Sequence, residues 1–474
     1  MSETKHAAIS FDGESKSNAM RESVATREPI SLRTYTPSQL VIERSAGLYH
    51  YTPDGRRLAD FTSGVLVANL GHNPKRWWQR LAHYMGWSPD VDFDGEYLML
   101  PPLTAYNAIS ALEVEANHRL LTSLHRTPLG AWLQQVMWSA SGSEGIQKAL
   151  WACLQFQPTR DVILATRYGF HGKKGLAEAV TGDEHAPNRD PRVRFIDFPR
   201  EACRDLDDGN EPYDPASTTK ELERLWTKTD GRVNCLITEP YLGGGGSFHP
   251  PKAYHAALQD FCRRRNVMLI FDEVQSNFGR TGEMYAFEKY GVEPDVVVLG
   301  KGLGNGVPVN CAVGRADVFA SLNYGGASDT WSAHPLGCAA ALATLDVFER
   351  ENVVEHAGNV SRIVEGGLRR LRELPHVAAV RGEGMVWGVE LADFEGHPAS
   401  AVAVACVREC YVGDVHGHAI HLLGPLAGKV IRISPPLTMT LDEAHHWMDV
   451  LVRLFARTAE RLAAAPAGEP ARVR

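Results

Sequence analysis

The chain has 474 residues, of which 44% are hydrophobic and 22% charged, and its net charge is −8. This length exceeds what one hydrophobic core usually holds, so we expect two domains, and the composition is typical of a soluble globular enzyme. The negative charge argues against a protein that binds nucleic acid by neutralising phosphates. No apolar run approaches the roughly 20 residues that span a bilayer, so no membrane segment is expected.

The N-terminus and the cysteines bear on the compartment. The first six residues, Met-Ser-Glu-Thr-Lys-His, lack the apolar core of a signal peptide. The eight cysteines include no CxxC pair, and Cys406 and Cys410 are the closest. Two thiols on one helix face do not make a zinc site. We therefore expect reduced cysteines, no bound metal and a cytoplasmic protein.

The N-terminal region divides into a tail and a small β-rich part. Residues 1–28 are polar and rich in Ser, Glu, Lys and Asn, which predicts a disordered tail. Residues 29–75 are expected to form the N-terminal part of a small domain. Short apolar runs over 40–60 alternate with turn signals such as Pro53-Asp54-Gly55, which predicts a β-meander. A loop then leads into a helix with Trp77-Trp78 near its start.

Residues 76–340 are expected to form a large domain in which helices and strands alternate. Short apolar segments predict strands at 136–138, 161–165, 193–196, 233–237, 267–271 and 296–299. Helical patterns lie between most of them. Because this alternation produces parallel strands with helices on both faces, we expect a mainly parallel mixed sheet flanked by helices.

Residues 341–474 predict a second, smaller domain. The segment is rich in helical patterns, with strands expected at 386–391 and 429–433. Its last residues, rich in Ala, Pro and Arg, are expected to fray. The predicted fold class is therefore α/β, with a large sheet domain and a small C-terminal α+β domain.

Two segments that follow predicted strands could bind a small molecule. Ser141, Gly142 and Ser143 open a helix, where small residues can turn backbone N–H groups toward a phosphate. The same segment could simply cap the helix. Phe170 could stack on a planar cofactor ring or pack in the core. The adjacent His171 could equally be a structural histidine.

Glu239 ends another predicted strand and is followed by Pro240 and the glycine run 243–246. Its carboxylate could support a site from behind the first layer of contacts. Alternatively, it caps the following turn. The glycines indicate a flexible or closely packed loop, and neither they nor the glycines of 300–306 fit a dinucleotide fingerprint.

Asp272 and Lys301 are the most informative residues, since each follows a wholly apolar strand. A lysine there can form a Schiff base with pyridoxal phosphate (PLP), and an aspartate can keep the pyridine nitrogen protonated. The released lysine amine can then move the Cα proton as a general base. Gln275 could contact the cofactor's phenolic oxygen. The alternatives are a helix N-cap for Asp272 and a solvated lysine in a glycine-rich turn.

Thr330 and Arg432 complete the set of candidate residues. Thr330 precedes a long alanine-rich helix and could donate to a phosphate oxygen. Arg432 lies in Ile-Arg-Ile-Ser-Pro-Pro and can grip a carboxylate with two hydrogen bonds. It could also be a surface arginine at a strand edge.

In this order, these segments resemble the class III (ω-type) aminotransferases of PLP fold type I, from about residue 40 to 455. The most specific stretch runs from Leu269 through Phe278-Gly279-Arg280-Thr281-Gly282 to Lys301. The resemblance implies PLP as cofactor, an amino donor and a carbonyl acceptor as substrates, and a homodimer with its active site at the subunit interface. It implies these roles: Lys301 as the Schiff-base lysine, Asp272 at the ring nitrogen, Gly142 and Ser143 at the phosphate, Phe170 on the ring, Gln275 at the ring hydroxyl, Thr330 at the phosphate of the neighbouring subunit's cofactor, and Arg432 at the substrate carboxylate.

The chain departs from the family pattern in three places. Gly145-Ile146-Gln147 stands where Ala-Asn-Glu is usual, and Phe170 where tyrosine is frequent. Members that use ω-amino donors often carry a glutamate that masks the carboxylate-binding arginine. Here Gly244 stands near that position, which argues against such donors and leaves the pocket open to a bulkier or different one.

Three functions fit the residues. The first is an aminotransferase that moves an amino group from an amino acid or amine to a keto acid or aldehyde. The second is an amino-acid racemase, epimerase or decarboxylase on the same fold, because the bond held perpendicular to the ring is the one that breaks. The third is an inactive binding or regulatory protein, against which the intact Lys301 and Asp272 argue.

Overall fold

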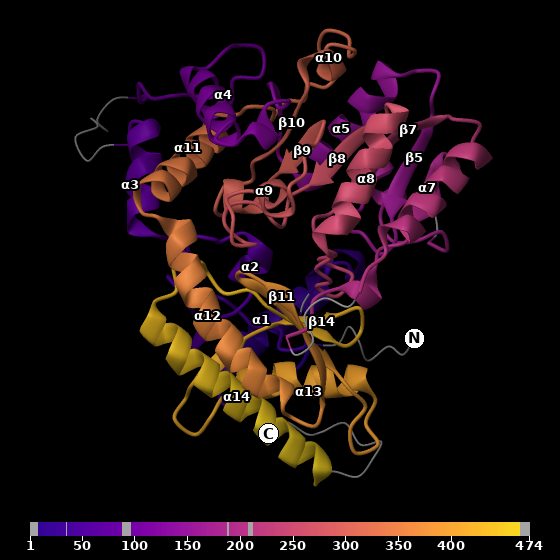
Figure 1. Ribbon diagram of the computed structural model, residues 1–474. Coiled ribbons are helices and arrows are strands. Elements are labelled where there is room, and N and C mark those ends of the chain that lie inside the picture. The colour runs from indigo at the N-terminus through magenta and orange to yellow at the C-terminus, as the bar shows by residue number, and fades with distance from the viewer. Residues whose placement is uncertain (1–7, 35, 88–95, 187–188, 207–211, 465–474) are drawn as a thin grey trace. The chain divides into compact units, whose positions relative to one another are not determined.

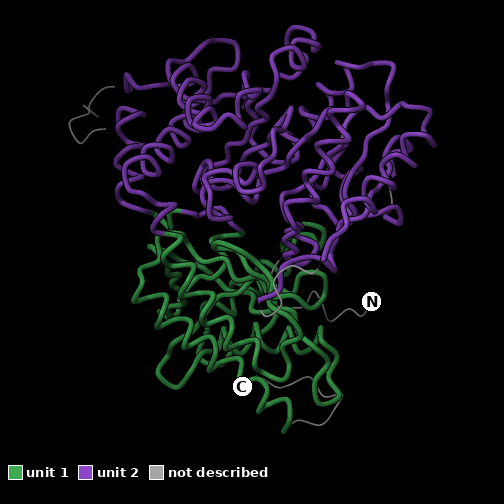
Figure 2. The backbone as a smooth tube through the Cα atoms, viewed as in Figure 1, with its two compact units in different colours: residues 1–65, 70–73, 357–474 green, residues 66–69, 74–356 purple. Residues whose placement is uncertain are grey.

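The computed structural model (Figure 1) describes residues 8–34, 36–87, 96–186, 189–206 and 212–464. The chain forms two compact units (Figure 2): unit 1 comprises residues 1–65, 70–73 and 357–474, and unit 2 comprises 66–69 and 74–356. The domain boundary expected at residue 340 falls inside helix α11 (Pro335–Arg350), which belongs entirely to unit 2. Over the described ranges, no helix has both the length and the hydropathy needed to cross a membrane.

Unit 2 is built on a seven-stranded sheet in the order β4-β10-β9-β8-β7-β5-β6. Its strands are β4 (Gln135–Ser139), β5 (Val162–Thr166), β6 (Val193–Ile196), β7 (Val233–Thr238), β8 (Met268–Asp272), β9 (Val296–Leu299) and β10 (Asn310–Gly314). Strand β10 runs antiparallel to β4 and β9, whereas β9, β8, β7, β5 and β6 pair in parallel. The predicted mainly parallel mixed sheet is therefore confirmed.

The burial of these strands explains why each one is an unbroken run of mostly apolar residues. Every residue of β5, β7, β8, β9 and β10 is buried. A parallel sheet covered on both faces requires apolar side chains on both sides of each strand. Helix α5 (Gly142–Phe156) supplies one cover, since its buried Ile146 and Leu150 share a core with Ile237 and Ile270.

The remaining helices of unit 2 surround the sheet or extend from it. They are α3 (Lys75–Tyr84), α4 (Ala111–Leu124), α6 (Gly175–Ala179), α7 (Pro215–Lys228), α8 (Lys252–Arg265), α9 (Ala286–Tyr290), α10 (Ala316–Phe319) and α11. Short 3-10 turns lie at Pro128–Gly130, Arg200–Ala202 and Lys301–Leu303. Two further helices, α2 (Ser63–Leu66) and α12 (Val353–Arg372), contain two of the four points where the chain passes between the units.

Unit 1 contains two four-stranded sheets. One has the order β1-β2-β3-β13, with β1 (Arg44–Ala46), β2 (Tyr49–Tyr51), β3 (Arg57–Asp60) and β13 (Ala419–His421). The other has the order β11-β12-β15-β14, with β11 (Val377–Glu383), β12 (Val386–Leu391), β15 (Val430–Ile433) and β14 (Leu423–Leu426). Its helices include α1 (Ser15–Arg27), α13 (Ala399–Val412) and α14 (Leu441–Ala463), with a 3-10 turn at Ile30–Leu32. The meander and the strands expected at 386–391 and 429–433 are confirmed, and the expected fraying of 465–474 lies outside the described residues.

The prediction of a disordered tail over residues 1–28 is wrong for Ser15–Arg27, which form α1. Arg21 donates to the Glu14 carboxylate and to the hydroxyl of Tyr411, both at 2.7 Å, and all three side chains are buried. Ser17 donates its backbone N–H to Asp54 at 2.9 Å. Tyr411 and Asp54 lie far along the chain from α1, so the local composition could not reveal these contacts. Residues 1–7 lie outside the described part.

Candidate active site

A cavity of about 350 Å³ lies in unit 2, at the edge of the sheet where its parallel strands end. This volume is within the ~300–1,000 Å³ range of small-molecule sites, and the carboxyl edge of such a sheet is where ligands usually bind. Nine predicted residues line the cavity: Ser141, Gly142, Ser143, Phe170, His171, Glu239, Asp272, Gln275 and Lys301. Their segments follow β4, β5, β7, β8 and β9. One edge of the sheet therefore brings together residues that are up to 160 positions apart in the sequence.

The start of α5 forms one wall of the cavity. Ser141 is the N-cap, its hydroxyl accepting from the Glu144 N–H at 3.3 Å while the Glu144 side chain accepts from the Ser141 N–H at 3.2 Å. This capping box fixes the helix end and leaves Gly142 and Ser143 facing the cavity. The first turn of a helix carries unpaired N–H groups and partial positive charge, so this wall suits an anion.

Two residues of the first departure from the family pattern, Gly145 and Gln147, have a packing explanation. A Cβ at Gly145 would lie 3.0 Å from Val298 Cγ1 and 3.1 Å from Asn310 Oδ1, so even an alanine would be tight here. The Gln147 side chain accepts from the Leu176 N–H at 3.0 Å and thereby ties α5 to the start of α6. These residues adapt the helix to its neighbours in this chain.

His171 and Asp272 form a buried pair in the wall of the cavity. His171 Nδ1 lies 2.7 Å from Asp272 Oδ2, and the Val274 N–H donates to Asp272 Oδ1 at 3.0 Å. Asp272 and His171 are both buried. The sequence left the role of His171 open, and the structure shows that it orients Asp272. The N-cap alternative for Asp272 is not what the structure shows, because the residue ends β8 and lines the cavity.

Glu239 holds the two loops beside this pair. Its carboxylate accepts from the Phe170 N–H at 3.0 Å and from the Gly243 N–H at 2.8 Å. Burial raises the pKa of Glu239 to about 7, with Asp272 adding to the rise and His171 opposing it. Glu239 therefore links the segment of Phe170 to the glycine run 243–246.

Lys301 lies in a closely packed turn after β9. Its φ of +46° is in the left-handed region, which is uncommon for a residue with a side chain. A Cβ at the preceding Gly300 would lie 1.7 Å from Asn310 Nδ2, so only glycine fits there. Asn277 donates to the Gly300 carbonyl at 3.1 Å. The glycines around Lys301 thus permit a specific lysine position in the cavity wall rather than a solvated turn.

Asn310 also lines the cavity and was missed by the sequence analysis. It begins β10, whose sequence Asn-Cys-Ala-Val-Gly is short and built largely of small residues. Val67, Val274 and Pro308 were likewise not predicted as cavity residues. The position of Asn310 after a Gly/Pro-containing turn that follows Lys301 is the signal that could have identified it.

Glu273, next to Asp272, has a different role. It is buried, and its carboxylate accepts from the Ala286 and Phe287 N–H groups at 2.7 and 2.6 Å, at the start of α9. Burial raises its pKa to about 8 against the effect of these two donors. Glu273 therefore anchors α9.

Thr330 and Arg432 are not among the residues that line this cavity. Thr330 is exposed, in a segment fixed by buried Lys148, whose ammonium donates to Asp329 Oδ2 at 2.7 Å and to Ser332 Oγ at 2.9 Å. Arg432 belongs to unit 1 and is buried in β15, which pairs with strands on both sides. The alternative of a surface arginine at a strand edge is therefore wrong.

The fold and the site agree with the family that the comparisons identify. The family model for class III aminotransferases matches residues 30–455. An omega-aminotransferase from Caulobacter vibrioides is 26% identical over 445 residues, covering 88% of this chain and 93% of the relative. A 2-aminoadipate transaminase from Pseudomonas putida is 30% identical over 426 residues, covering 85% and 92%. The PLP-bound crystal structure of an amine transaminase from an uncultivated Pseudomonas species superposes with a TM-score of 0.75 at 25% identity, covering 91% and 99%.

These observations first define a PLP-dependent transferase of fold type I. The chain belongs to the class III aminotransferase family, and it is an aminotransferase that uses pyridoxal 5′-phosphate. The cavity fits this cofactor. Around a cavity of about 350 Å³ lie a helix N-terminus that suits a phosphate, the buried carboxylate of Asp272, which suits a protonated ring nitrogen, and Lys301.

Proposed function

We propose that Lys301 is the residue to which the cofactor is covalently attached and that its amine carries the proton during transfer of an amino group from an amino acid or amine to a keto acid or aldehyde. The observation that carries this proposal is that Lys301 and Asp272 line the same cavity as the start of α5. When bound, PLP supplies an electron-withdrawing ring that makes a substrate Cα proton removable. The Lys301 amine would accept that proton from Cα and hold it for return.

The other cavity residues hold and orient the cofactor in this proposal. Asp272, oriented by His171, would keep the ring-nitrogen proton in place. Gly142 and Ser143 would hold the phosphate through the N-terminus of α5, and Phe170 would cover the ring face. Gln275 would donate to the ring oxygen. Glu239 fixes Phe170 and the glycine loop from behind, through its two backbone hydrogen bonds.

Borohydride reduction followed by peptide mapping tests the attachment site directly. We expect the reduced cofactor adduct on the peptide that contains Lys301, and we expect Lys301→Ala to lose turnover while still retaining some PLP noncovalently. An adduct on another lysine, or an active Lys301→Ala enzyme, would contradict the assignment. When the enzyme is given an amino donor without an acceptor, we expect the absorbance to show the cofactor in its amine form. A racemase would instead return it to its starting absorbance.

For the substrate, we propose a donor whose carboxylate is taken by Arg432. The loop from Tyr241 to Phe248 contains no carboxylate. Gly244 packs so that a Cβ would lie 3.3 Å from Phe170 Cβ, which leaves little room for a side chain directed toward the ring. A donor screen should therefore favour amino acids that react at the α-amino group over 4-aminobutyrate and ornithine. Exclusive use of ω-amino acids would contradict this.

We further propose a cytoplasmic homodimer in which Thr330 contacts the cofactor phosphate of the neighbouring subunit. Met99, Tyr324 and Trp331 are large apolar side chains that the single chain leaves exposed, as expected of surfaces covered by a second copy. All eight cysteines are buried and free, in keeping with a reducing compartment. Sedimentation of the holoenzyme should give the mass of two chains, and Thr330→Ala should weaken PLP retention. A monomer with full PLP affinity would contradict the dimer.

A further inference from the structure

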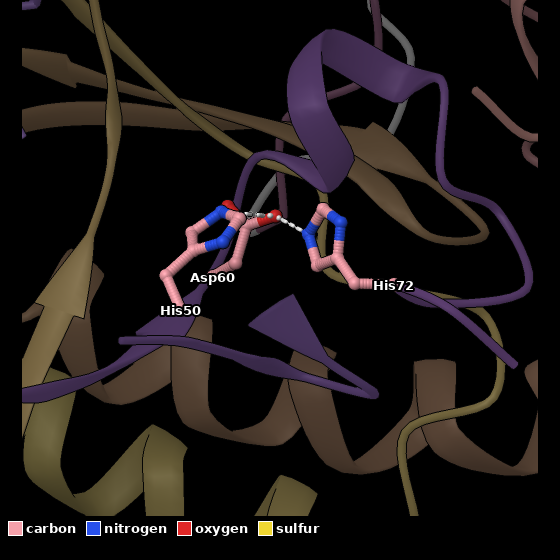
Figure 3. A group of neighbouring side chains, drawn as sticks. All are labelled: His50, Asp60 and His72. Atoms are coloured by element: carbon pink, nitrogen blue, oxygen red, sulfur yellow. Dashed lines mark hydrogen bonds and ion pairs between the residues drawn. The ribbon is translucent and has the colours of Figure 1, made fainter. Parts of the chain in front are cut away.

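Three side chains of unit 1 converge at a second buried position, in the sheet that contains β2 and β3. His50 comes from β2, Asp60 ends β3, and His72 follows twelve residues later (Figure 3). The Asp60 carboxylate lies between the two imidazole rings (Figure 3). Asp60 Oδ2 is 2.7 Å from His72 Nε2 and 3.4 Å from His50 Nε2. One ligand atom from each residue lies within 4.8 Å of the other two.

These distances are close to those of a metal centre. Zinc bonds of about 2.0–2.1 Å to nitrogen and oxygen put tetrahedral ligands about 3.3 Å apart. The 3.4 Å contact already has that spacing, and the 2.7 Å contact requires an opening of about 0.6 Å. Two imidazoles and one carboxylate are also a donor set that first-row transition ions accept.

The outer atoms of the cluster are held in the way that metal ligands usually are. His50 Nδ1 lies 2.7 Å from Ser45 Oγ, and Asp60 Oδ1 accepts the Thr62 N–H at 2.8 Å. Such outer hydrogen bonds fix the ring orientation and tautomer of a ligating histidine. Each of these two ligands therefore keeps its remaining donor atom toward the centre of the cluster.

A third histidine, His421, lies beside the cluster. His421 is the β13 residue opposite Asp60 in the parallel pairing of β3 and β13, and its ring centre is 5.8 Å from that of His50. Its Nδ1 is buried and makes no hydrogen bond within the described residues. The side chains of His50 and Asp60 are 4% and 0% exposed, whereas that of His72 is 15% exposed. An ion can therefore enter from the His72 side.

We propose that His50, Asp60 and His72 bind one divalent first-row transition ion, of which Zn²⁺ is the best match, with a fourth position open to water or to His421. The ion would join the β2–β3 hairpin to the segment around His72. This role is structural and separate from the aminotransferase chemistry. The competing arrangement is a hydrogen-bonded histidine–aspartate–histidine group without an ion.

Titration of the holoenzyme separates the two arrangements. The protein is treated with a chelator, dialysed, and titrated with Zn²⁺ alone by calorimetry and with Co²⁺ alone by visible absorption. We expect one ion per chain and a Co²⁺ spectrum of low coordination number. Zn²⁺ should also raise the unfolding temperature in proportion to the logarithm of its concentration, because it binds the folded state.

Variants identify the ligands. His50→Gln and His72→Gln should each lower Zn²⁺ affinity by at least about 100-fold, and Ser45→Ala, which keeps every ligand, by about 10–100-fold. His445→Gln, at an exposed histidine of α14, is the matched control and should bind Zn²⁺ as the parent does. Absence of binding to the parent, or parent-like binding by His50→Gln, would overturn the proposal. If the ligand variants do not fold, an unchanged Ser45→Ala would overturn it instead.

Discussion

Asp272 in unit 2 and Asp60 in unit 1 are both buried aspartates at the end of a strand. Each is the last residue of a strand, is at least 95% buried and is hydrogen-bonded by histidine. Asp272 has one histidine partner, His171, and its carboxylate also lines a cavity of about 350 Å³. Asp60 lies between two histidines, His50 and His72, and is fully enclosed.

The difference shows what makes a buried aspartate a site for a small molecule. Burial alone would raise the pKa of Asp60, but the hydrogen bonds from His50 and His72 hold it well below its usual range. His50, His72 and the Thr62 N–H face its carboxylate, so we expect Asp60 to hold unit 1 together, with or without an ion. Asp272 keeps access to a cavity, so an external cation such as a protonated ring nitrogen can be its partner.

The largest expected effect is on stability, at Asp60. Asp60→Asn removes the buried anion shared by His50 and His72, and breaking a buried ion pair from one side typically costs about 3–5 kcal/mol. We expect a clear fall in the unfolding temperature of unit 1. Because the folded-state pKa of Asp60 is depressed, its contribution is present above the unfolded value near 3.8 and is lost as the pH falls below it. Asp60→Asn should flatten this acid limb, and an unchanged limb would contradict the prediction.

Asp272→Asn should instead act on catalysis. Loss of the charge opposite the ring nitrogen should lower kcat by about 10²–10³-fold, as for other preorganised electrostatic groups, while PLP stays bound. Steady-state kinetics and cofactor absorbance measure the two quantities. Asp442→Asn, at an exposed aspartate in the first turn of α14, is the control and should match the parent. An equal kcat in the two variants would contradict a role for the Asp272 charge in catalysis.

We expect the stability of the cofactor-free enzyme to depend on pH through Glu239. Its folded-state pKa of about 7 lies above the unfolded value of 4.5, so the folded state binds the extra proton. The associated stability is fully present below pH 4.5 and is lost as the pH rises through 7, by up to about 3 kcal/mol. Glu239→Gln should flatten this slope in cofactor-free enzyme, at the expense of one backbone hydrogen bond. Denaturant unfolding between pH 4.5 and 8 gives the measurement, and identical slopes would contradict the prediction.

The smallest effect is expected at His171. His171→Ala removes a hydrogen bond to a charged group, worth about 1.5–3 kcal/mol, and should lower kcat by about tenfold or more with little change in KM. His171→Gln can still donate to Asp272 and should recover part of the loss. A merely structural role would instead change the unfolding temperature and leave kcat per folded enzyme unchanged.

Much of unit 2 was predictable because short local segments of the sequence identify its strands and the residues that follow them. Strands such as Val296–Leu299 are wholly apolar, and charged or glycine residues end them, so both the strand and its carboxyl end can be identified. Parallel pairing then brings Asp272, Glu239 and Lys301 to one edge. β10 and its Asn310 escaped prediction because a five-residue strand with small side chains has little hydrophobic pattern.

The sequence by itself determined the α/β class, the cofactor lysine and aspartate as candidates, and the family to which they belong, because those features depend on short segments in a fixed order. Only the tertiary structure decided that His171 orients Asp272, that Arg21 ties α1 to Tyr411, and that His50, Asp60 and His72 meet. Those contacts join segments between 10 and 390 residues apart. Their formation depends on strand pairing and burial, which no local pattern of residues records.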